Sequence, residues 1–135
     1  MLGDTDGLKR NDAHHLADKI IETAKKVHLS VGSGFSEEIY ERELAERLKE
    51  RKLSFTFKPI IKVKYDDFKL SGQKVDFIVE ESVLVDVICK DCLPADGQDM
   101  LLNLHVTGKK VGLVINFGKV EFEHNVVHAE GKGLC

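Results

Sequence analysis

Two aspartates, Asp76 and Asp86, each interrupt a short apolar run that is typical of a β-strand. The residues between the two runs fit a three-residue hairpin loop that pairs Val79 with Val83, and this register places Asp76 opposite Asp86. Facing Cβ atoms in such a pair lie roughly 4.5–5.5 Å apart. Because two carboxylates at that distance repel and are costly to bury alone, the pattern predicts a divalent cation between them.

This expectation depends on the register of the hairpin. A two-residue turn at Glu81 and Ser82 would place the two aspartates on opposite faces of the sheet. A third acid, Glu37, precedes Tyr40 by one turn of an expected helix and therefore points along its apolar stripe. Two interpretations of Glu37 stay open, an auxiliary acid of the metal site and a first-turn residue that complements the helix dipole.

Composition limits the classes of protein that this chain represents. Its 135 residues fit one domain, and its three cysteines do not form a disulfide framework. No apolar run reaches the roughly 18 residues of a membrane span and the polar start lacks a signal-peptide core, so we expect a cytoplasmic protein without a membrane partner. The net charge of −3 excludes a protein that coats nucleic acid by charge alone. Alternating lysines predict either a solvated strand face or a local basic surface: Lys58, Lys62, Lys64, Lys69 and Lys74.

The periodicity of apolar residues predicts a single α/β (α+β) domain. Helices are expected over residues 12–29, 36–52 and 98–106, and strands over 60–65, 68–70, 74–79, 83–88, 110–117 and, at an edge, 120–122. The first four strands most simply form an antiparallel meander, which the later strand extends into a mixed sheet flanked by helices. We therefore expect a disordered arm over 1–11, the domain over 12–123 and a tail over 124–135.

Four local patterns occur in order along the chain. They are Val27-His28, the Gly-x-x-Glu-x-x-Tyr pattern over 34–40, the run 74–79 around Asp76, and the run 107–118 with its Gly-Lys-Lys and Asn-Phe-Gly triplets. Together they resemble the signatures of the GxxExxY protein family of the PD-(D/E)XK nuclease superfamily. The resemblance covers about residues 16–118 and implies a nuclease-like core that uses Mg²⁺ or Mn²⁺.

The resemblance also implies roles for particular residues, with two departures. It assigns the metal ligands to Asp76, Asp86 and Glu37, in agreement with the facing pair expected from the hairpin. The position of the superfamily's lysine, two residues after Asp86, is Ile88, and its glutamine near the start of the third helix is also missing, since Asp99 or Met100 aligns there.

Two lysines are candidates to replace the missing ammonium group. The hairpin register that pairs Asp76 with Asp86 places Lys74 opposite Ile88, on the neighbouring strand. Lys90 follows Ile88 on the same face, roughly 6–7 Å further along. An ammonium group there would orient the nucleophile and offset transition-state charge in metal-assisted hydrolysis.

A set of soft ligands follows the second aspartate. Cys89 and Cys92, with His124 and His128, offer two pairs of the kind that bind zinc. The long separation between Cys92 and His124 differs from the compact finger pattern, which favours two reduced cysteines beside a strand end over a zinc site.

Two functional hypotheses follow. The three retained acids favour a metal, whereas Ile88, the missing glutamine and the acidic net charge favour loss of catalysis. We therefore expect a nuclease-like protein with a partly degenerate metal site that binds DNA, RNA or a protein partner with little or no turnover. The alternative is an active Mg²⁺-dependent nuclease with Asp76, Asp86, Glu37 and Lys74 or Lys90 at its centre. The oligomeric state is not indicated by the sequence.

Overall fold

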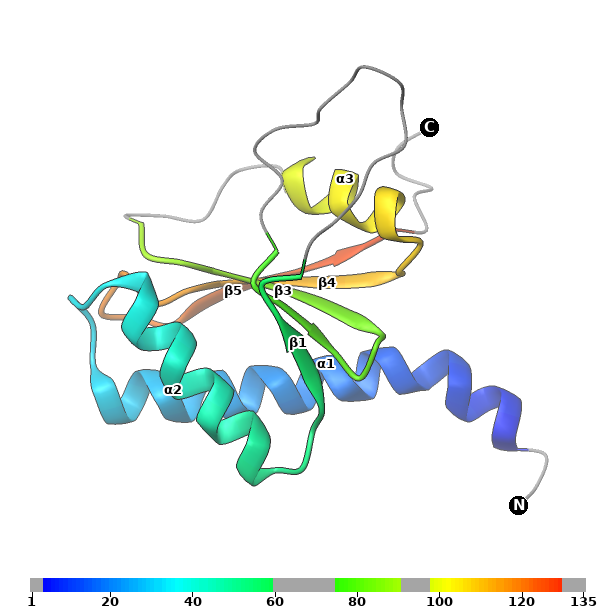
Figure 1. The fold of residues 1–135 in the computed structure, drawn as a ribbon, viewed down its shortest axis with the longest axis horizontal. Coiled ribbons are helices and arrows are strands. Elements are labelled where there is room, and N and C mark those ends of the chain that lie inside the picture. The colour runs from blue at the N-terminus through cyan, green and yellow to red at the C-terminus, as the bar shows by residue number, and fades with distance from the viewer. Residues whose placement is uncertain (1–3, 60–74, 91–97, 130–135) are drawn as a thin grey trace.

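A computed structural model describes residues 4–59, 75–90 and 98–129 (Figure 1). In chain order, its elements are α1 (Asp4–Val31), α2 (Glu37–Glu50), β1 (Phe55–Phe57), β2 (Phe77–Val79), β3 (Val83–Ile88), α3 (Gln98–Thr107), β4 (Val111–Asn116) and β5 (Glu123–His128). The five strands form one sheet in the order β1-β2-β3-β4-β5. Among the described strands only β3 and β4 run parallel, joined by a crossover through α3, so the sheet is mixed as expected.

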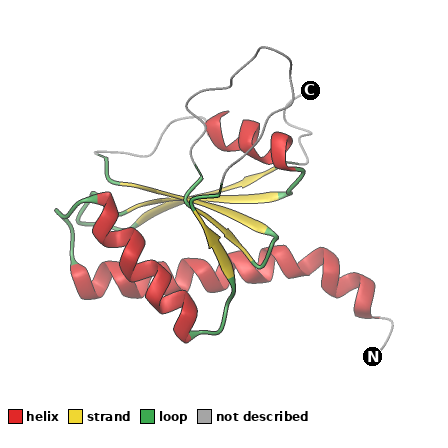
Figure 2. Cartoon of the chain, viewed as in Figure 1, coloured by secondary structure: helices red, strands yellow, loops and turns green. Residues whose placement is uncertain are grey.

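The helices cover both faces of the sheet. Figure 2 shows α1 and α2 beneath one face and α3 above the other. Strand β3 is apolar on both sides because it lies between these layers: Val83, Val85 and Val87 belong to the core under α1 and α2, and Leu84 and Ile88 to the core under α3. The prediction of a central strand covered on both sides is therefore confirmed.

Two ends of the chain differ from the expectation. Helix α1 begins at Asp4, inside the segment expected to be a disordered arm, and strand β5 occupies the start of the expected tail. The expected edge strand at 120–122 does not form, and Val120 is 85% exposed in the turn before β5. The strand forms over residues 123–128 instead, because its pairing with β4 places the apolar Val127 over the α3 side of the core.

Strand β1 was not expected from the sequence. It pairs antiparallel with β2, and the rings of Phe55 and Phe77 meet edge to face at 5.3 Å. The three-residue segment is a strand because of its aromatic contact and its hydrogen bonds with β2. Its own apolar pattern was too short to be recognised in the sequence. The strands expected at 60–65 and 68–70 lie outside the described residues.

The glycine and tyrosine of the 34–40 pattern have structural roles. Tyr40 is buried, its ring stacks on Phe117 at 4.6 Å, and its hydroxyl donates a hydrogen bond to the carbonyl of Gly32. The same hydroxyl oxygen accepts a bond of 3.4 Å from the backbone N–H of Phe35. Gly34 has φ of 98°, a conformation that favours glycine, so the pattern builds the turn that leads into α2.

The Asn-Phe-Gly triplet closes the end of β4 against the chain that leaves β3. Asn116 is fully buried, and its amide exchanges two hydrogen bonds with the backbone of Lys90, of 3.0 and 3.1 Å. A Cβ atom at Gly118 would lie 2.6 Å from the backbone nitrogen of Lys90, so only glycine allows this approach.

Within the described residues, no helix has the length and apolar character that crossing a membrane requires.

Candidate functional site

The β2–β3 hairpin has the predicted register as far as its last ladder pair. Val79 pairs with Val83 and Phe77 with Val85, which confirms the three-residue loop. The next bond departs from the expectation, because the backbone N–H of Asp76 donates to Val85 at 2.9 Å. Asp76 and Phe77 therefore both face Val85, which is a β-bulge and interrupts the ladder before Asp76 can pair with Asp86.

The bulge turns Asp76 toward helix α2. Its side chain is 1% exposed, and its Oδ2 accepts a hydrogen bond of 2.7 Å from the backbone N–H of Val87. Its Oδ1 lies 3.8 Å from the ammonium nitrogen of Lys58. The carboxylate of Asp76 thus binds β3 on one side and a lysine on the other.

A second buried carboxylate, Glu41, joins Asp76 from α2. Glu41 is 3% exposed, and its Oε1 lies 3.3 Å from the Nζ of Lys58. Burial raises the pKa of Glu41, and the charge of Asp76 and a hydrogen bond with its carboxyl group raise it further, whereas Lys58 lowers it. We call Glu41, Lys58 and Asp76 the acid–lysine cluster.

Lys58 reaches the cluster from the end of β1. Its backbone N–H donates to the carbonyl of Asp76 at 2.6 Å, which extends the β1–β2 ladder by one residue beyond Phe57. Its side chain is 54% exposed, so water reaches the ammonium group while the two carboxylates stay buried. The cluster is therefore an ion pair at the sheet edge, in which the lysine contacts solvent and the two carboxylates do not.

Asp86 and Ile88 lie on the other face of β3. Side chains alternate along a strand, so Asp86 shares the α3 side with Leu84 and Ile88, whereas Val85 and Val87 share the side of α2. Ile88 is 5% exposed and packs in the core under α3. The bulge thus ends the backbone ladder before the predicted pairing of Asp76 with Asp86. Their roles as metal ligands stay predictions.

The other predicted residues have varied surroundings. Glu37 is half-buried, one turn before Glu41, and Lys90 is exposed just after β3. Lys74 and Cys92 lie outside the described residues, Cys89 packs partly buried against the core, and His124 and His128 are exposed on β5. The roles of Glu37, Lys74 and Lys90, and the zinc alternative, stay predictions.

Sequence reasoning missed two members of the acid–lysine cluster. Glu41 follows Glu37 by one turn and precedes Leu44 and Leu48 at helical spacing, so it lies on the stripe of α2 that is buried. This periodicity was a readable signal. No sequence pattern placed Lys58 beside the two acids, because its position depends on the pairing of β1 with β2.

The carboxylates of the acid–lysine cluster are the candidate ligands for a divalent cation. Two converging carboxylates are the start of a hard-metal donor set. The ammonium group of Lys58 lies beside both of them, however, and no set of three histidine, cysteine, aspartate or glutamate side chains converges anywhere in the part of the chain that the structure describes. The arrangement fits a neutralised ion pair better than a site for Mg²⁺ or Mn²⁺.

Comparisons with known proteins identify the superfamily. No curated protein and no solved structure matches the chain. The model of the PD-(D/E)XK nuclease superfamily matches residues 14–128, which include α2, α3, the strands β1 to β5 and most of α1. The order of helices, antiparallel hairpin, crossover helix and parallel strand agrees with that match, and the chain belongs to the PD-(D/E)XK nuclease superfamily.

Proposed function

We propose that this chain is a GxxExxY-type member of the superfamily that binds nucleic acid with little or no hydrolysis. The observation that carries the proposal is the acid–lysine cluster. The ammonium of Lys58 lies 3.3 Å from Glu41 and 3.8 Å from Asp76, in the position from which a cation would neutralise both carboxylates. A divalent ion would therefore have to displace the ammonium of Lys58, which already offsets part of the buried negative charge.

The surroundings of Ile88 support the same proposal. Metal-assisted hydrolysis needs a cation that activates water and a positive group that stabilises the charge of the transition state. Ile88 supplies no charge and packs in the core under α3, on the side of β3 that also carries Asp86. Glu41 and Asp76 thus lie against α2, whereas Ile88, at the position of the superfamily's lysine, packs in the core under α3.

Nucleic acid is the ligand that superfamily membership favours. The net charge of −3 requires that binding use a local concentration of basic side chains. A binding role for a protein partner is the competing outcome of the experiment below.

The test combines a binding assay with a cleavage assay on the full chain. Plasmid DNA, single-stranded DNA and single-stranded RNA are incubated with the protein in MgCl₂, MnCl₂ or EDTA. We expect fluorescence anisotropy to show binding of at least one nucleic acid that EDTA does not abolish, and gels to show no metal-dependent product. Mg²⁺-dependent cleavage that Asp76→Asn removes would overturn the loss of hydrolysis, and absence of binding to all three would overturn the ligand.

A second function is favoured by one observation, that Lys58 lies beside both buried carboxylates. In that case Lys58 replaces the lysine that the superfamily has two residues after its second acid, and the protein is an active nuclease. Wild type would then cleave, Lys58→Met would lose most of the rate, and Ile88→Val would keep it. Equal rates for wild type and Lys58→Met would exclude this role for Lys58.

A further inference from the structure

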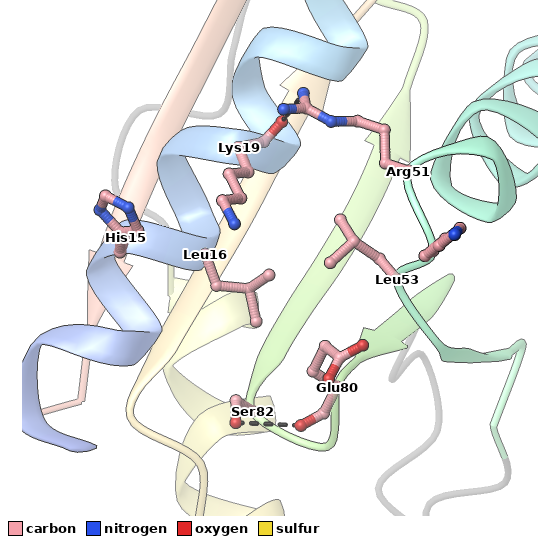
Figure 3. A pocket seen from close by; sticks show the side chains of 8 residues that line it. His15, Leu16, Lys19, Arg51, Leu53, Glu80 and Ser82 are labelled. Atoms are coloured by element: carbon pink, nitrogen blue, oxygen red, sulfur yellow. Dashed lines mark hydrogen bonds between the residues drawn. The ribbon is translucent and has the colours of Figure 1, made fainter. Parts of the chain in front are cut away.

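A cleft opens at the end of β2 that is remote from the acid–lysine cluster. It has a volume of about 390 Å³ and is formed by α1, by the chain between α2 and β1, and by the β2–β3 turn (Figure 3). Its size falls within the range of about 300–1,000 Å³ that is usual for small-ligand sites. About 15 Å of helix α2 separates Glu41, near its start, from Arg51, just after its end. The cleft is therefore a separate site.

The charge of the cleft is opposite to that of the whole chain. Lys19, Arg51 and Lys52 line it and His15 adds an imidazole, although the chain as a whole has a net charge of −3. Among the described residues that line the cleft, Glu80 is the one carboxylate. The Oε2 of Glu80 accepts hydrogen bonds of 2.7 and 3.2 Å from the N–H and hydroxyl of Ser54. That carboxylate is held against the chain before β1, and the excess charge of the cleft is positive.

Two of the cations have no acidic partner among the described residues. Arg51 lies 3.6 Å from the carboxylate of Glu22, which offsets its charge in part. Neither Lys19 nor Lys52 has a carboxylate within ion-pair distance among residues 4–59, 75–90 and 98–129. A cleft with two uncompensated ammonium groups attracts an anion.

The walls of the cleft are held in place by hydrogen bonds. Figure 3 shows Arg51 reaching across to α1, where its Nη1 donates to the carbonyl of Lys19 at 3.3 Å and to the hydroxyl of Thr23 at 2.9 Å. On the other side, the N–H of Glu80 donates to the carbonyl of Ser54 at 2.8 Å. These bonds join all three segments, so the cations need little reorganisation to meet a ligand.

Lys52 occupies a backbone position that normally belongs to glycine. Its φ is 62°, its N–H donates to the carbonyl of Lys49, and the next N–H, of Leu53, donates to Leu48, which together form a Schellman motif at the end of α2. A lysine there has the strain of the left-handed conformation without improving the helix end. What the lysine adds is a charged side chain in the cleft, and strain of this kind is often found at functional sites.

We propose that this cleft binds a phosphate monoester, either on a free nucleotide or at the 5′ end of a nucleic-acid strand. Lys19 and Lys52 contact the phosphate oxygens, because ammonium groups bind phosphate as point charges. Leu16 and Leu53, which also line the cleft, cover the apolar face of the attached sugar and base. The inference does not depend on the proposed function of the acid–lysine cluster.

The test uses two fluorescein-labelled oligothymidylates that differ only at the 5′ end, one with a phosphate and one with a hydroxyl, in EDTA at low salt. We expect the 5′-phosphate to strengthen binding about tenfold, in line with hydrogen bonds to charged groups. Lys19→Ala/Lys52→Ala should remove this gain. The matched control Lys25→Ala/Lys26→Ala deletes two exposed lysines of α1 outside the cleft and should keep it.

Competition distinguishes the two sources of the phosphate. If AMP displaces the phosphorylated probe and adenosine does not, the cleft accepts free nucleotides. If only an unlabelled 5′-phosphorylated strand displaces the probe, the cleft recognises strand ends. AMP binding in a calorimeter without any binding of oligonucleotides would support the cleft and contradict the proposed function.

One variant separates loss of binding from loss of the fold. Lys52→Gly places the preferred residue at the end of α2, so it should weaken binding of the phosphorylated probe about fivefold or more while the melting temperature stays the same or rises. Equal binding of the two oligonucleotides to the wild type, together with no heat of binding from AMP, would overturn the proposal. So would an unchanged preference for the 5′-phosphate in Lys19→Ala/Lys52→Ala.

Discussion

Strand β2 runs between two charged sites that differ in how their charge is neutralised. At its start, the buried carboxylates of Glu41 and Asp76 share the ammonium of Lys58, and Asp76 also accepts a hydrogen bond from the backbone N–H of Val87. At its end, the cleft carries exposed Lys19 and Lys52, and no carboxylate of the described residues lies within ion-pair distance of either. The difference follows from burial: desolvated charge must be matched within the protein, whereas charge in contact with water is free to remain in excess and to meet a ligand.

The largest effect is expected for a cation placed in the apolar core, where no carboxylate would match its charge. Ile88→Lys would bury an ammonium group in the core under α3 and should lower the free energy of unfolding by about 4 kcal/mol. Ile88→Val, the control, should lose only about 1 kcal/mol. Urea denaturation measures both. If Ile88→Lys instead kept wild-type stability and gained Mg²⁺-dependent cleavage, the position would be a vacant part of a nuclease site.

The next effect concerns the acceptor that Asp76 supplies to β3. Asp76→Ala removes a buried hydrogen bond between a carboxylate and Val87 and one partner of Lys58, and should lower the free energy of unfolding by about 2–3 kcal/mol. Asp76→Asn keeps an oxygen that accepts the bond, so its loss should be clearly smaller. Equal stability of wild type and Asp76→Ala in urea would show that the cluster does not support the fold.

A smaller effect is expected from the pH dependence that Glu41 imposes. Because the folded protein raises the pKa of Glu41 above its ordinary value of 4.5, the native state holds this proton more tightly than the unfolded chain does. The contribution of Glu41 to stability is therefore complete below about pH 4.5 and is lost as the pH rises through the folded pKa.

Glu41→Gln removes this titration. The stability of Glu41→Gln relative to wild type should therefore increase from pH 4.5 toward neutral pH, as measured by urea midpoints at several pH values. A constant difference between the two proteins, or one that decreases with pH, would contradict a raised pKa and would make the ion pair with Lys58 the dominant influence on Glu41.

The smallest effect is expected at the cleft. Lys52→Gly should raise the free energy of unfolding by about 0.5–1 kcal/mol, because it relieves a left-handed lysine. Lys19→Ala should change it by less than about 0.5 kcal/mol, as is usual for an exposed side chain. A large destabilisation by either substitution, measured by thermal unfolding, would mean that the cations of the cleft are structural, as Lys58 is.

Much of the sheet was predictable because its signals are local. The apolar run at 83–88 and the three-residue loop before it were enough to place β3 and its pairing with β2, and both were confirmed. The third helix and the buried strand after it were also predicted, with differences of one residue at their ends. The edge strands were not, since β1 and β5 depend on partners distant in the chain rather than on a pattern of their own.

By itself, the sequence determined the superfamily, the mixed α/β fold and the presence of acids on a central hairpin, because apolar periodicity and loop length act over a few residues. Only the tertiary structure decided which charges meet. A one-residue bulge at Asp76 reverses the face that strand alternation would assign to it, and the rotation of α2 brings Glu41 against it. Lys58 joins the acid–lysine cluster because β1 pairs with β2, and these two strands lie far apart in the sequence.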